Sequence, residues 1–214
     1  MPSAQLKLNP LTLVTLQSPE LMNGSRLHRY PSLYQLNTRE NHDEPRAGVT
    51  FALQKHQAAA VLTYLCSGLR FFHEGQFERV PIHLDRQPAE PGEPILRDSS
   101  ARLLDCVDRP GDRGRGLGLL EAALAWGANR TYDCFVCLAW YTQGIPPLVV
   151  VNCAPNQSQR YLRFPFDEIR GQTLRTLDLL SSVVYQHAGE ELVLGGMFFD
   201  LPAWGYHAFK LETR

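Results

Sequence analysis

The sequence predicts an α+β fold, in which a mostly antiparallel mixed sheet is combined with three main helices at about residues 55–73, 116–127 and 171–188. Apolar residues recur at helical spacing in the first and third of these segments. The second segment follows a glycine-rich loop and is apolar on nearly every side. Much of the remaining chain consists of short alternating or continuously apolar runs between turn residues, which is typical of strands.

Strands are predicted for four segments of the N-terminal half, at residues 5–17, 32–36, 48–53 and 77–85. Residues 18–47 contain three prolines and an Asn-Gly pair, which predicts a long loop around the second of these strands. A connection of this length is uncommon in a compact domain and often binds a ligand or a partner. In the helix that follows, Leu65 belongs to the apolar face, so we expect it to be buried.

Residues 86–100 contain three prolines and five charged residues, which predicts a surface linker. The chain is therefore expected to be a single compact unit of residues 1–214, or two lobes, 1–85 and 101–214, joined by this segment. Directly after it, residues 101–107 are predicted to form a strand that leads into the glycine-rich loop.

Residues 131–142 are predicted to form a strand, and their apolar run from 134 to 141 predicts that both faces of this strand are covered. A Gly-Ile-Pro-Pro turn then leads to its hairpin partner at 148–153. The C-terminal part is predicted to hold a strand at 160–166, the helix at 171–188 and a closing hairpin of 191–199 with 204–212. We expect Leu177 on the buried face of that helix.

The composition is that of an ordinary globular protein, with 44% hydrophobic and 20% charged residues. A net charge of −1 excludes a global field that would draw the protein to nucleic acid or membranes. The basic residues are 18 Arg against 3 Lys, which fits either a GC-rich genome or planar recognition of phosphate. No leader or membrane-spanning run is evident, and the odd count of 5 cysteines indicates reduced thiols. We therefore expect a cytoplasmic protein without a membrane partner.

The most unusual stretch runs from Asp108 to Trp126, where glycines and arginines lead into the apolar helix expected at 116–127. Backbone N–H groups at a helix N-terminus and guanidinium groups both suit phosphate, and glycines let a ligand approach the main chain. The candidate ligand-binding residues are Arg109, Arg113, Gly114, Arg115, Gly116 and Gly118.

The segment Arg113–Gly118 resembles the R/Q-x-x-G-x-G/A pyrophosphate loop of the GCN5-type acyltransferases, with residues 101–107 in the place of the preceding strand. The resemblance covers about a tenth of the chain. It implies a CoA-dependent acyltransferase. A flexible turn before a core helix is the alternative interpretation of the same residues.

Cys134 and Cys137 have the C-x-x-C spacing of zinc sites, but no second such pair follows. Residues three apart on a strand point to opposite faces, so we expect both thiols in the core and no zinc. Cys106 or Cys153 beside His187 would give a nucleophile with its base, which needs a proximity that the sequence does not reveal.

A facial triad of metal ligands, superficially similar to the H-x-D…H arrangement of iron(II) oxygenases, would use His83 and Asp85 with His187 or His207. Surface positions for these side chains are the simpler interpretation. We therefore predict neither a metal nor a cofactor, and the catalytic residues stay unassigned.

Aromatic residues of the C-terminal half could include stacking platforms for bases, although most should lie in the core. They are Trp126, Trp140, Tyr141, Phe198, Phe199, Trp204, Tyr206 and Phe209. The aromatic residues that we expect nearer the surface are Tyr30, Tyr34, Tyr161 and Tyr206.

Three functions are compatible with these patterns. The first is a binding module for a phosphate-bearing ligand, RNA or nucleotide, through the Gly/Arg loop. The second is a non-catalytic protein-interaction subunit of a larger assembly, since no catalytic constellation is evident. The third is a CoA-dependent acyltransferase. The expected partners are accordingly a nucleic acid or nucleotide, or a protein, and enzyme activity is not favoured.

Overall fold

The computed structural model describes residues 36–37, 47–66, 69–70, 72, 94–107, 117–120, 122–140, 147–164 and 167–213. Its helices are α2 (Ala47–Thr50), α3 (Leu53–Leu65), α4 (Pro94–Val107) and α5 (Gly189–Leu194), with the short 3-10 turns η2 (Thr131–Cys134) and η3 (Asp167–Ile169). Its strands are β1 (Leu36–Asn37), β2 (Leu69–Arg70), β3 (Leu117–Leu119), β4 (Ala122–Ala123), β5 (Phe135–Trp140), β6 (Leu148–Asn152), β7 (Ser158–Leu162), β8 (Thr173–Asp178), β9 (Val184–Ala188), β10 (Met197–Leu201) and β11 (Tyr206–Thr213).

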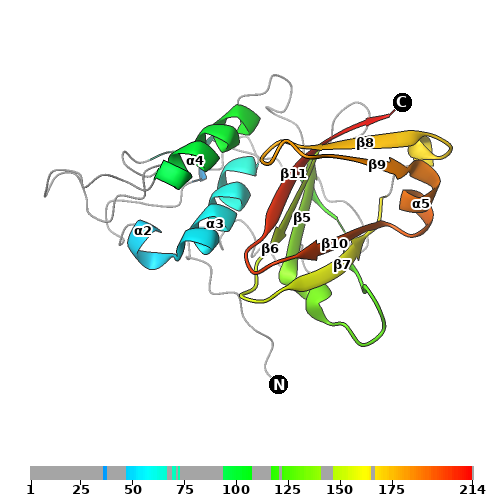
Figure 1. The fold of residues 1–214 in the computed structure, drawn as a ribbon, viewed down its shortest axis with the longest axis horizontal. Helices are drawn as coiled ribbons and strands as arrows, with labels where there is room; N and C mark the ends of the chain where they lie inside the picture. Colours follow the sequence, from blue (N-terminus) through cyan, green and yellow to red (C-terminus); the bar gives the residue numbers. More distant parts are fainter. Residues whose placement is uncertain are drawn as a thin grey trace, which may run out of the picture.

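Two antiparallel sheets form a sandwich. The larger has six strands in the order β3-β5-β6-β11-β8-β9, and the smaller has three in the order β10-β7-β4. Their facing side chains form one hydrophobic cluster that includes Val150, Leu162, Phe199 and Phe209. Helices α3 and α4 pack on the other face of the six-stranded sheet (Figure 1). The sheet is therefore the middle of three layers.

The central strands of the large sheet are covered on both faces, as the apolar run at 134–141 predicts. On β6, Leu148 and Val150 belong to the cluster between the sheets, whereas Val149 and Val151 belong to the cluster under the helices. This alternation follows from the strand's period of two. The predicted hairpin of 131–142 with 148–153 is confirmed, because β5 and β6 pair in antiparallel register.

The predicted fold class is confirmed: the described residues combine helices with a mostly antiparallel sheet. The helix expected at 55–73 is α3, which ends at Leu65, where the next residue, Cys66, turns to extended backbone. Leu65 is buried, as predicted, with 4% of its surface exposed. The division of the chain into one unit or two lobes stays a prediction.

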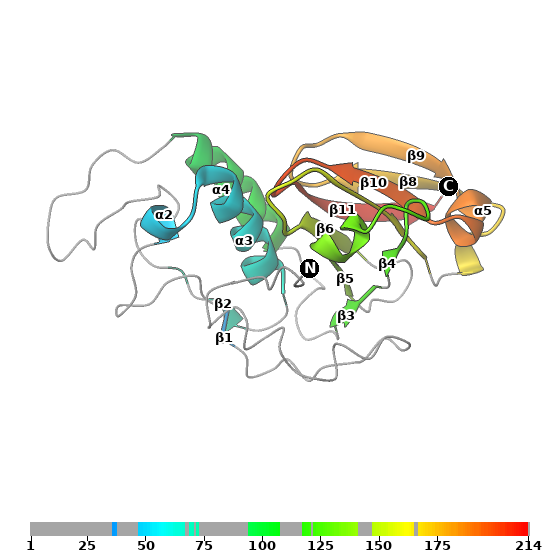
Figure 2. The same ribbon diagram turned by 90° about the horizontal axis from the view of Figure 1, so that it is seen from below.

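The helix expected at 116–127 is wrong, because strands β3 and β4 occupy this segment. β3 pairs with β5 and β4 pairs with β7, so the segment passes from one sheet to the other. Leu120 lies between them and fills the core of the sandwich. Glycine is a poor helix former. Where the segment crosses between the sheets (Figure 2), Leu120 is buried, whereas Leu119, Leu124 and Trp126 are exposed, so the apolar residues do not mark a buried helix.

The helix expected at 171–188 is also wrong, because β8 and β9 form an antiparallel hairpin there. Leucines at 174, 177 and 180 suggested a helical face, but the buried set is Leu174, Thr176 and Asp178, which alternate. Leu177 is only half-buried, on the opposite face of β8. The β-branched residues on both sides of the turn favour strands.

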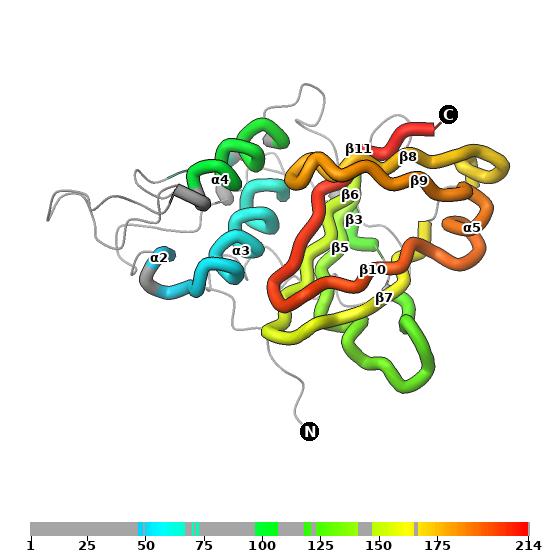
Figure 3. The backbone as a smooth tube through the Cα atoms, viewed as in Figure 1, coloured from blue at the N-terminus to red at the C-terminus, as the bar shows by residue number. Residues whose placement is uncertain are grey.

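Three more local predictions are wrong. Residues 94–107, expected as linker and strand, form α4, in which Leu103 and Cys106 pack toward α3 at helical spacing. The strand expected at 48–53 does not form, because residues 48–50 belong to α2 and residue 53 begins α3. The closing hairpin does not form, because β10 pairs with β7 while β11 lies between β6 and β8. Figure 3 shows β7 beside β10, although they are far apart in the chain.

The buried amide of Asn152 holds the loops at one end of the sandwich. Its Nδ2 donates hydrogen bonds to the carbonyl oxygens of Asn156 at 2.8 Å, Pro202 at 2.8 Å and Leu201 at 3.3 Å. Its Oδ1 accepts from the N–H of Ala154 at 3.1 Å. One side chain thus satisfies polar groups of the two loops that follow β6 and β10.

Candidate functional site

The residues of the predicted Gly/Arg loop are Arg109, Arg113, Gly114, Arg115, Gly116 and Gly118. All but the last lie outside the described residues. Gly118 is buried in β3, opposite Ala139 of β5. Because the expected helix is absent, no helix N-terminus follows the loop to present unpaired N–H groups to an anion. The predicted phosphate site therefore lacks the helix N-terminus on which the prediction was based.

The two cysteines of the C-x-x-C segment contact the same cluster between the sheets. Cys134 ends the turn η2 instead of lying in a strand, so the expectation that the two thiols point to opposite faces is wrong. Burial raises the pKa of both thiols, that of Cys137 to about 11. Such neutral thiols are weak nucleophiles and weak metal ligands.

Of the two other constellations considered from the sequence, the metal triad stays untested, and the Cys–His pair does not form among the described residues. His83 and Asp85 lie outside the described residues. His187 pairs with Leu174 on the sandwich side of the large sheet, whereas Cys106 and Cys153 lie on its helical side. Within the described ranges, no three His, Cys, Asp or Glu side chains gather as metal ligands would.

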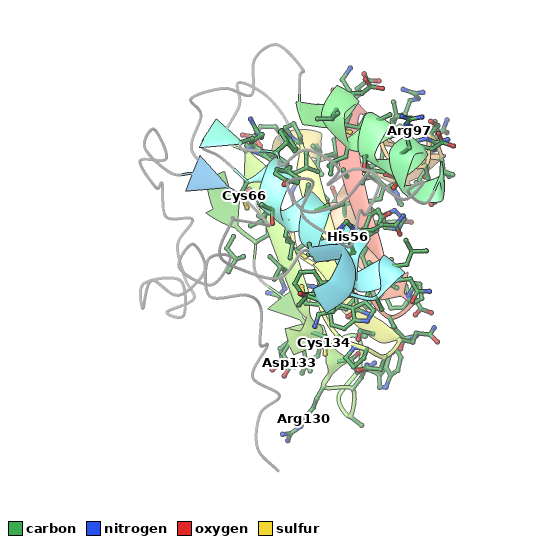
Figure 4. The ribbon with its side chains drawn as sticks, turned by 90° about the vertical axis from the view of Figure 1, so that its left-hand side faces the viewer. His56, Cys66, Arg97, Arg130, Asp133 and Cys134 are labelled. Carbon is green, nitrogen blue, oxygen red and sulfur yellow. The ribbon has the colours of Figure 1, made fainter. Side chains whose placement is uncertain are left out.

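The helical side of the molecule carries scattered polar groups instead of a cluster. In Figure 4, Arg97 lies on α4 and His56 on α3, while Arg130, Asp133 and Cys134 lie at the far end. A cavity of about 30 Å³ lies between α3, α4 and the turn after β8. It is lined by His56, Gln57, Ala60, Val61, Ser99, Ser100, Leu103, Leu180 and Tyr206. This volume is large enough for a water molecule and too small for a sugar or a nucleotide.

Asp178, with 1% of its surface exposed, is the centre of a buried hydrogen-bond network. Its carboxylate accepts from His207 Nδ1 at 2.9 Å, Ser181 Oγ at 2.5 Å and the N–H groups of Leu180 at 3.1 Å and Ala208 at 3.3 Å. Burial alone would raise the pKa of Asp178, but the hydrogen bonds and charge of its partners hold it below its usual value. The network fixes the turn between β8 and β9 against β11.

The outer face of the three-stranded sheet carries an exposed aromatic ring, Phe198, beside the partly exposed ring of Tyr161. Tyr161 of β7 and Phe198 of β10 are cross-strand partners, with ring centroids 5.2 Å apart and planes inclined by 49°. Phe198 is 44% exposed. Trp126, which is 51% exposed, lies in the loop between β4 and η2. Exposed rings grouped in this way are typical of binding surfaces.

Hydrogen-bonding side chains surround these rings. Gln159 lies two residues from Tyr161 on the same face of β7, and its Oε1 accepts from Asn129 Nδ2 at 3.1 Å. Asp200, which pairs with Gln159 in the sheet register, accepts from Gln157 Nε2 at 2.7 Å. The surface therefore combines two rings with amide and carboxylate groups.

Sequence reasoning treated this region only in part. Trp140, Phe199 and Phe209 are buried, as predicted, and Tyr161 is partly exposed. Trp126 and Phe198 are exposed instead, so the expectation that most of these rings lie in the core is wrong for them. Sequence reasoning did not single out Phe198, because its exposure depends on β10 pairing with β7. The alternation of Met197, Phe199 and Leu201 inward was the available signal for an outward Phe198.

No family model matches the sequence, and no curated protein matches it significantly. Solved structures do share the fold. An α-amylase from Geobacillus thermoleovorans, solved with acarbose, has a TM-score of 0.60 at 15% identity and covers 81% of this chain. A noncanonic maltogenic α-amylase from Thermotoga neapolitana has a TM-score of 0.57 at 13% identity and covers 84% of this chain. A Nostoc punctiforme debranching enzyme has a TM-score of 0.57 at 15% identity and covers 82% of this chain. The matches span 38%, 39% and 33% of those chains, respectively.

These neighbours overturn the predicted function. They are carbohydrate-active enzymes, so a binding module for RNA or nucleotide is wrong. The acyltransferase alternative also fails, because residues 101–107 are helical and the segment after the loop forms strands. The alternative of a non-catalytic interaction subunit is corrected by the same neighbours, which are enzymes.

Among the described residues, no helix has the length and apolar character needed to cross a membrane. The chain shares the fold of part of these larger enzymes.

Proposed function

We propose that this chain is a region of an enzyme that acts on α-linked glucans, and that its sandwich contacts the glucan. The observation that carries the proposal is the fold shared with two α-amylases and a debranching enzyme over 81–84% of this chain. The chain spans less than two fifths of each of these proteins, so the rest of such an enzyme would be supplied by further sequence.

The described N-terminal elements support a role within a larger protein. β1 and β2 are parallel strands of two residues each, and the chain between them contains α2 and α3. Parallel strands joined through helices occur in larger sheets that are covered on both faces. A pair of this size contributes little stability by itself. We therefore propose that this part completes an α/β unit together with other residues of the enzyme.

The outer surface of the sandwich supports the contact with glucan. Tyr161 and Phe198 offer apolar ring faces, and Gln157 and Asn129 bring amide groups near them. The non-polar face of a pyranose ring packs against aromatic rings, while its hydroxyl groups need hydrogen-bond partners. A neutral sugar matches this combination better than an anionic ligand does.

The thiols support a reducing compartment. Each of the cysteines, Cys66, Cys106, Cys134, Cys137 and Cys153, is free. Burial raises the pKa of Cys66 and Cys153 to about 12, which protects both from oxidation. We keep the cytoplasm as the proposed location, and fractionation of the source cells tests it.

The function is tested by thermal unfolding with and without sugars. A ligand that binds the folded state raises the melting temperature, and the shift grows with the ratio of free ligand to its Kd. We expect maltoheptaose to raise the melting temperature of this protein and cellohexaose to leave it unchanged. Native electrophoresis in gels cast with amylopectin should show retarded migration as well. If neither maltoheptaose nor amylopectin has an effect, the proposal is wrong.

A further inference from the structure

We infer that the outer face of the three-stranded sheet is a glucan-binding surface, on which Tyr161 and Phe198 stack against successive pyranose rings of an α-linked chain. The inference rests on the proposed function and assigns it to named residues. It places the sugar on the sandwich, outside the small cavity under the helices. The class of ligand is a neutral, curved α-glucan.

The first argument is the register of the two strands. Phe198 of β10 lies directly opposite Tyr161 of β7, and Ala123 of β4 lies on the other side of Tyr161. Ala123 has a small side chain, and Tyr161 is partly exposed. The two rings thus form one row across the sheet, with their centroids 5.2 Å apart.

The second argument is that the core does not require the ring of Phe198. The inward residues of β10, Met197 and Phe199, fill the core, and both are only 4% exposed. Phe198 points away from that core and remains 44% exposed. An exposed apolar ring lowers the solubility of a protein and does not stabilise its core. Such a ring therefore favours a binding surface.

The third argument is the inclination of the rings. Their planes meet at 49°, so the two ring faces do not form a flat platform. Chains with β-linkages extend as flat ribbons and need coplanar rings. Chains with α-linkages curve, so successive sugar faces are inclined to one another. The geometry of Tyr161 and Phe198 therefore selects the α-linked chain.

The fourth argument is the charge of the surface. Arg163, exposed just after β7, and Asp200 of β10 carry opposite charges, so the described side chains of this face have no net charge. An anionic polymer would need a positive face. The amide groups of Gln159 and Asn129 already bond each other and can exchange this bond for sugar hydroxyl groups at small net cost.

The loop from β4 to η2 extends this surface. It leaves the sheet at Ala123, next to Tyr161, and returns at Asn129, which bonds Gln159. Trp126 lies within this loop and is 51% exposed. We assign to it a third sugar contact at the edge of the sheet.

The test compares variants by affinity electrophoresis in amylopectin and by titration with maltoheptaose. Phe198→Leu keeps an apolar side chain and removes the ring, and Phe198→Tyr keeps the ring. We expect Phe198→Leu to weaken binding roughly tenfold and Phe198→Tyr to bind like the wild type. Tyr161→Leu should act like Phe198→Leu. Leu194→Ala is the matched control, since Leu194 is an apolar residue on α5 with 73% exposure.

The outcomes separate this inference from the proposed function. If the wild type binds maltoheptaose and both leucine variants bind equally well, the surface is wrong and the function stands. If cellohexaose binds as tightly as maltoheptaose, the selection of a curved chain is wrong. If Phe198→Leu turns a dimer into a monomer, the face is an interface between two copies and the inference fails. If the wild type binds no glucan, both proposals fail.

Discussion

The guanidinium group of Arg160 lies over the ring of Phe135 inside the sandwich, with its central carbon 5.5 Å from the ring centre. Only 1% of Arg160 is exposed, and its Nε and Nη2 atoms are buried without a hydrogen-bond partner among the described residues. Burial lowers the pKa of this arginine from its usual value. The attraction between the guanidinium charge and the ring offsets part of the free energy lost when the charge leaves water, but not all of it.

We therefore predict that Arg160→Met raises the free energy of unfolding by about 1 kcal/mol or more, because it removes a buried charge at similar volume. Urea melts at a constant m-value measure the change. Arg160→Ala is the control for volume, and it should be less stable than Arg160→Met because it leaves a cavity. A less stable Arg160→Met would show that the guanidinium group has a partner that stabilises the fold.

Asp178→Asn should lower the free energy of unfolding by about 2–3 kcal/mol at neutral pH, since an amide cannot accept all of the hydrogen bonds that the carboxylate accepts. Asp98→Asn, on the exposed side of α4, is the matched control and should change stability little. Equal stability of the two variants would mean that the network around Asp178 does not hold the turn.

The same carboxylate predicts a pH dependence. Its pKa in the folded protein is below the ordinary value of 3.8, so its contribution is present above that value and is lost as the pH falls through the folded pKa. The difference in stability between wild type and Asp178→Asn should therefore shrink below about pH 4 and stay constant between about pH 5 and 6. Denaturant melts over this range measure it. A difference that grows on acidification would contradict the assignment.

Asn152→Ala should lower the free energy of unfolding by about 2–3 kcal/mol, because it leaves the carbonyl groups of Asn156 and Pro202 without their donor. Asn156→Ala is the control, since this side chain is exposed and bonds Gln157 and Ser158 locally. Hydrogen exchange of the loops after β6 and β10 should rise only in the Asn152 variant. Unchanged exchange in both loops would show that other contacts hold them.

The two leucines expected in helices now have different predictions. Leu65→Ala should cost about 2–5 kcal/mol, because Leu65 is buried between α3 and the large sheet. Leu177→Ala should cost about 1 kcal/mol, because Leu177 is only half-buried on β8. Thermal and denaturant melts of both variants measure the difference. Equal costs would mean that the outer face of β8 is covered by more of the protein than the described residues show.

Local patterns were sufficient where one period dominated. The helix α3 and the hairpin of β5 and β6 follow from an apolar face and from an unbroken apolar run. Local patterns failed at β8. Leucines spaced by three residues suggested a helix there, but the side chains that point inward are Leu174, Thr176 and Asp178, which alternate along a strand. A polar Asp178 at a buried position hides the alternation, and only its partners on β11 show why it is there.

The candidate site depended on contacts between distant segments. Phe198 and Tyr161 are separated by 36 residues and meet only because β10 pairs with β7. Sequence reasoning concentrated on the Gly/Arg loop, where composition is unusual, and expected a helix where pairing with β5 and β7 forms the strands β3 and β4.

By itself the sequence determined the α+β class, the helix around Leu65 and the doubly covered hairpin, since each is encoded in the spacing of neighbouring apolar residues. Only the tertiary structure decided which strands pair, which of the aromatic rings remain exposed, and that Asp178 is buried with its donors. The reason is physical: side-chain burial and hydrogen-bond partners depend on segments that are remote in the chain, and the local pattern constrains them weakly.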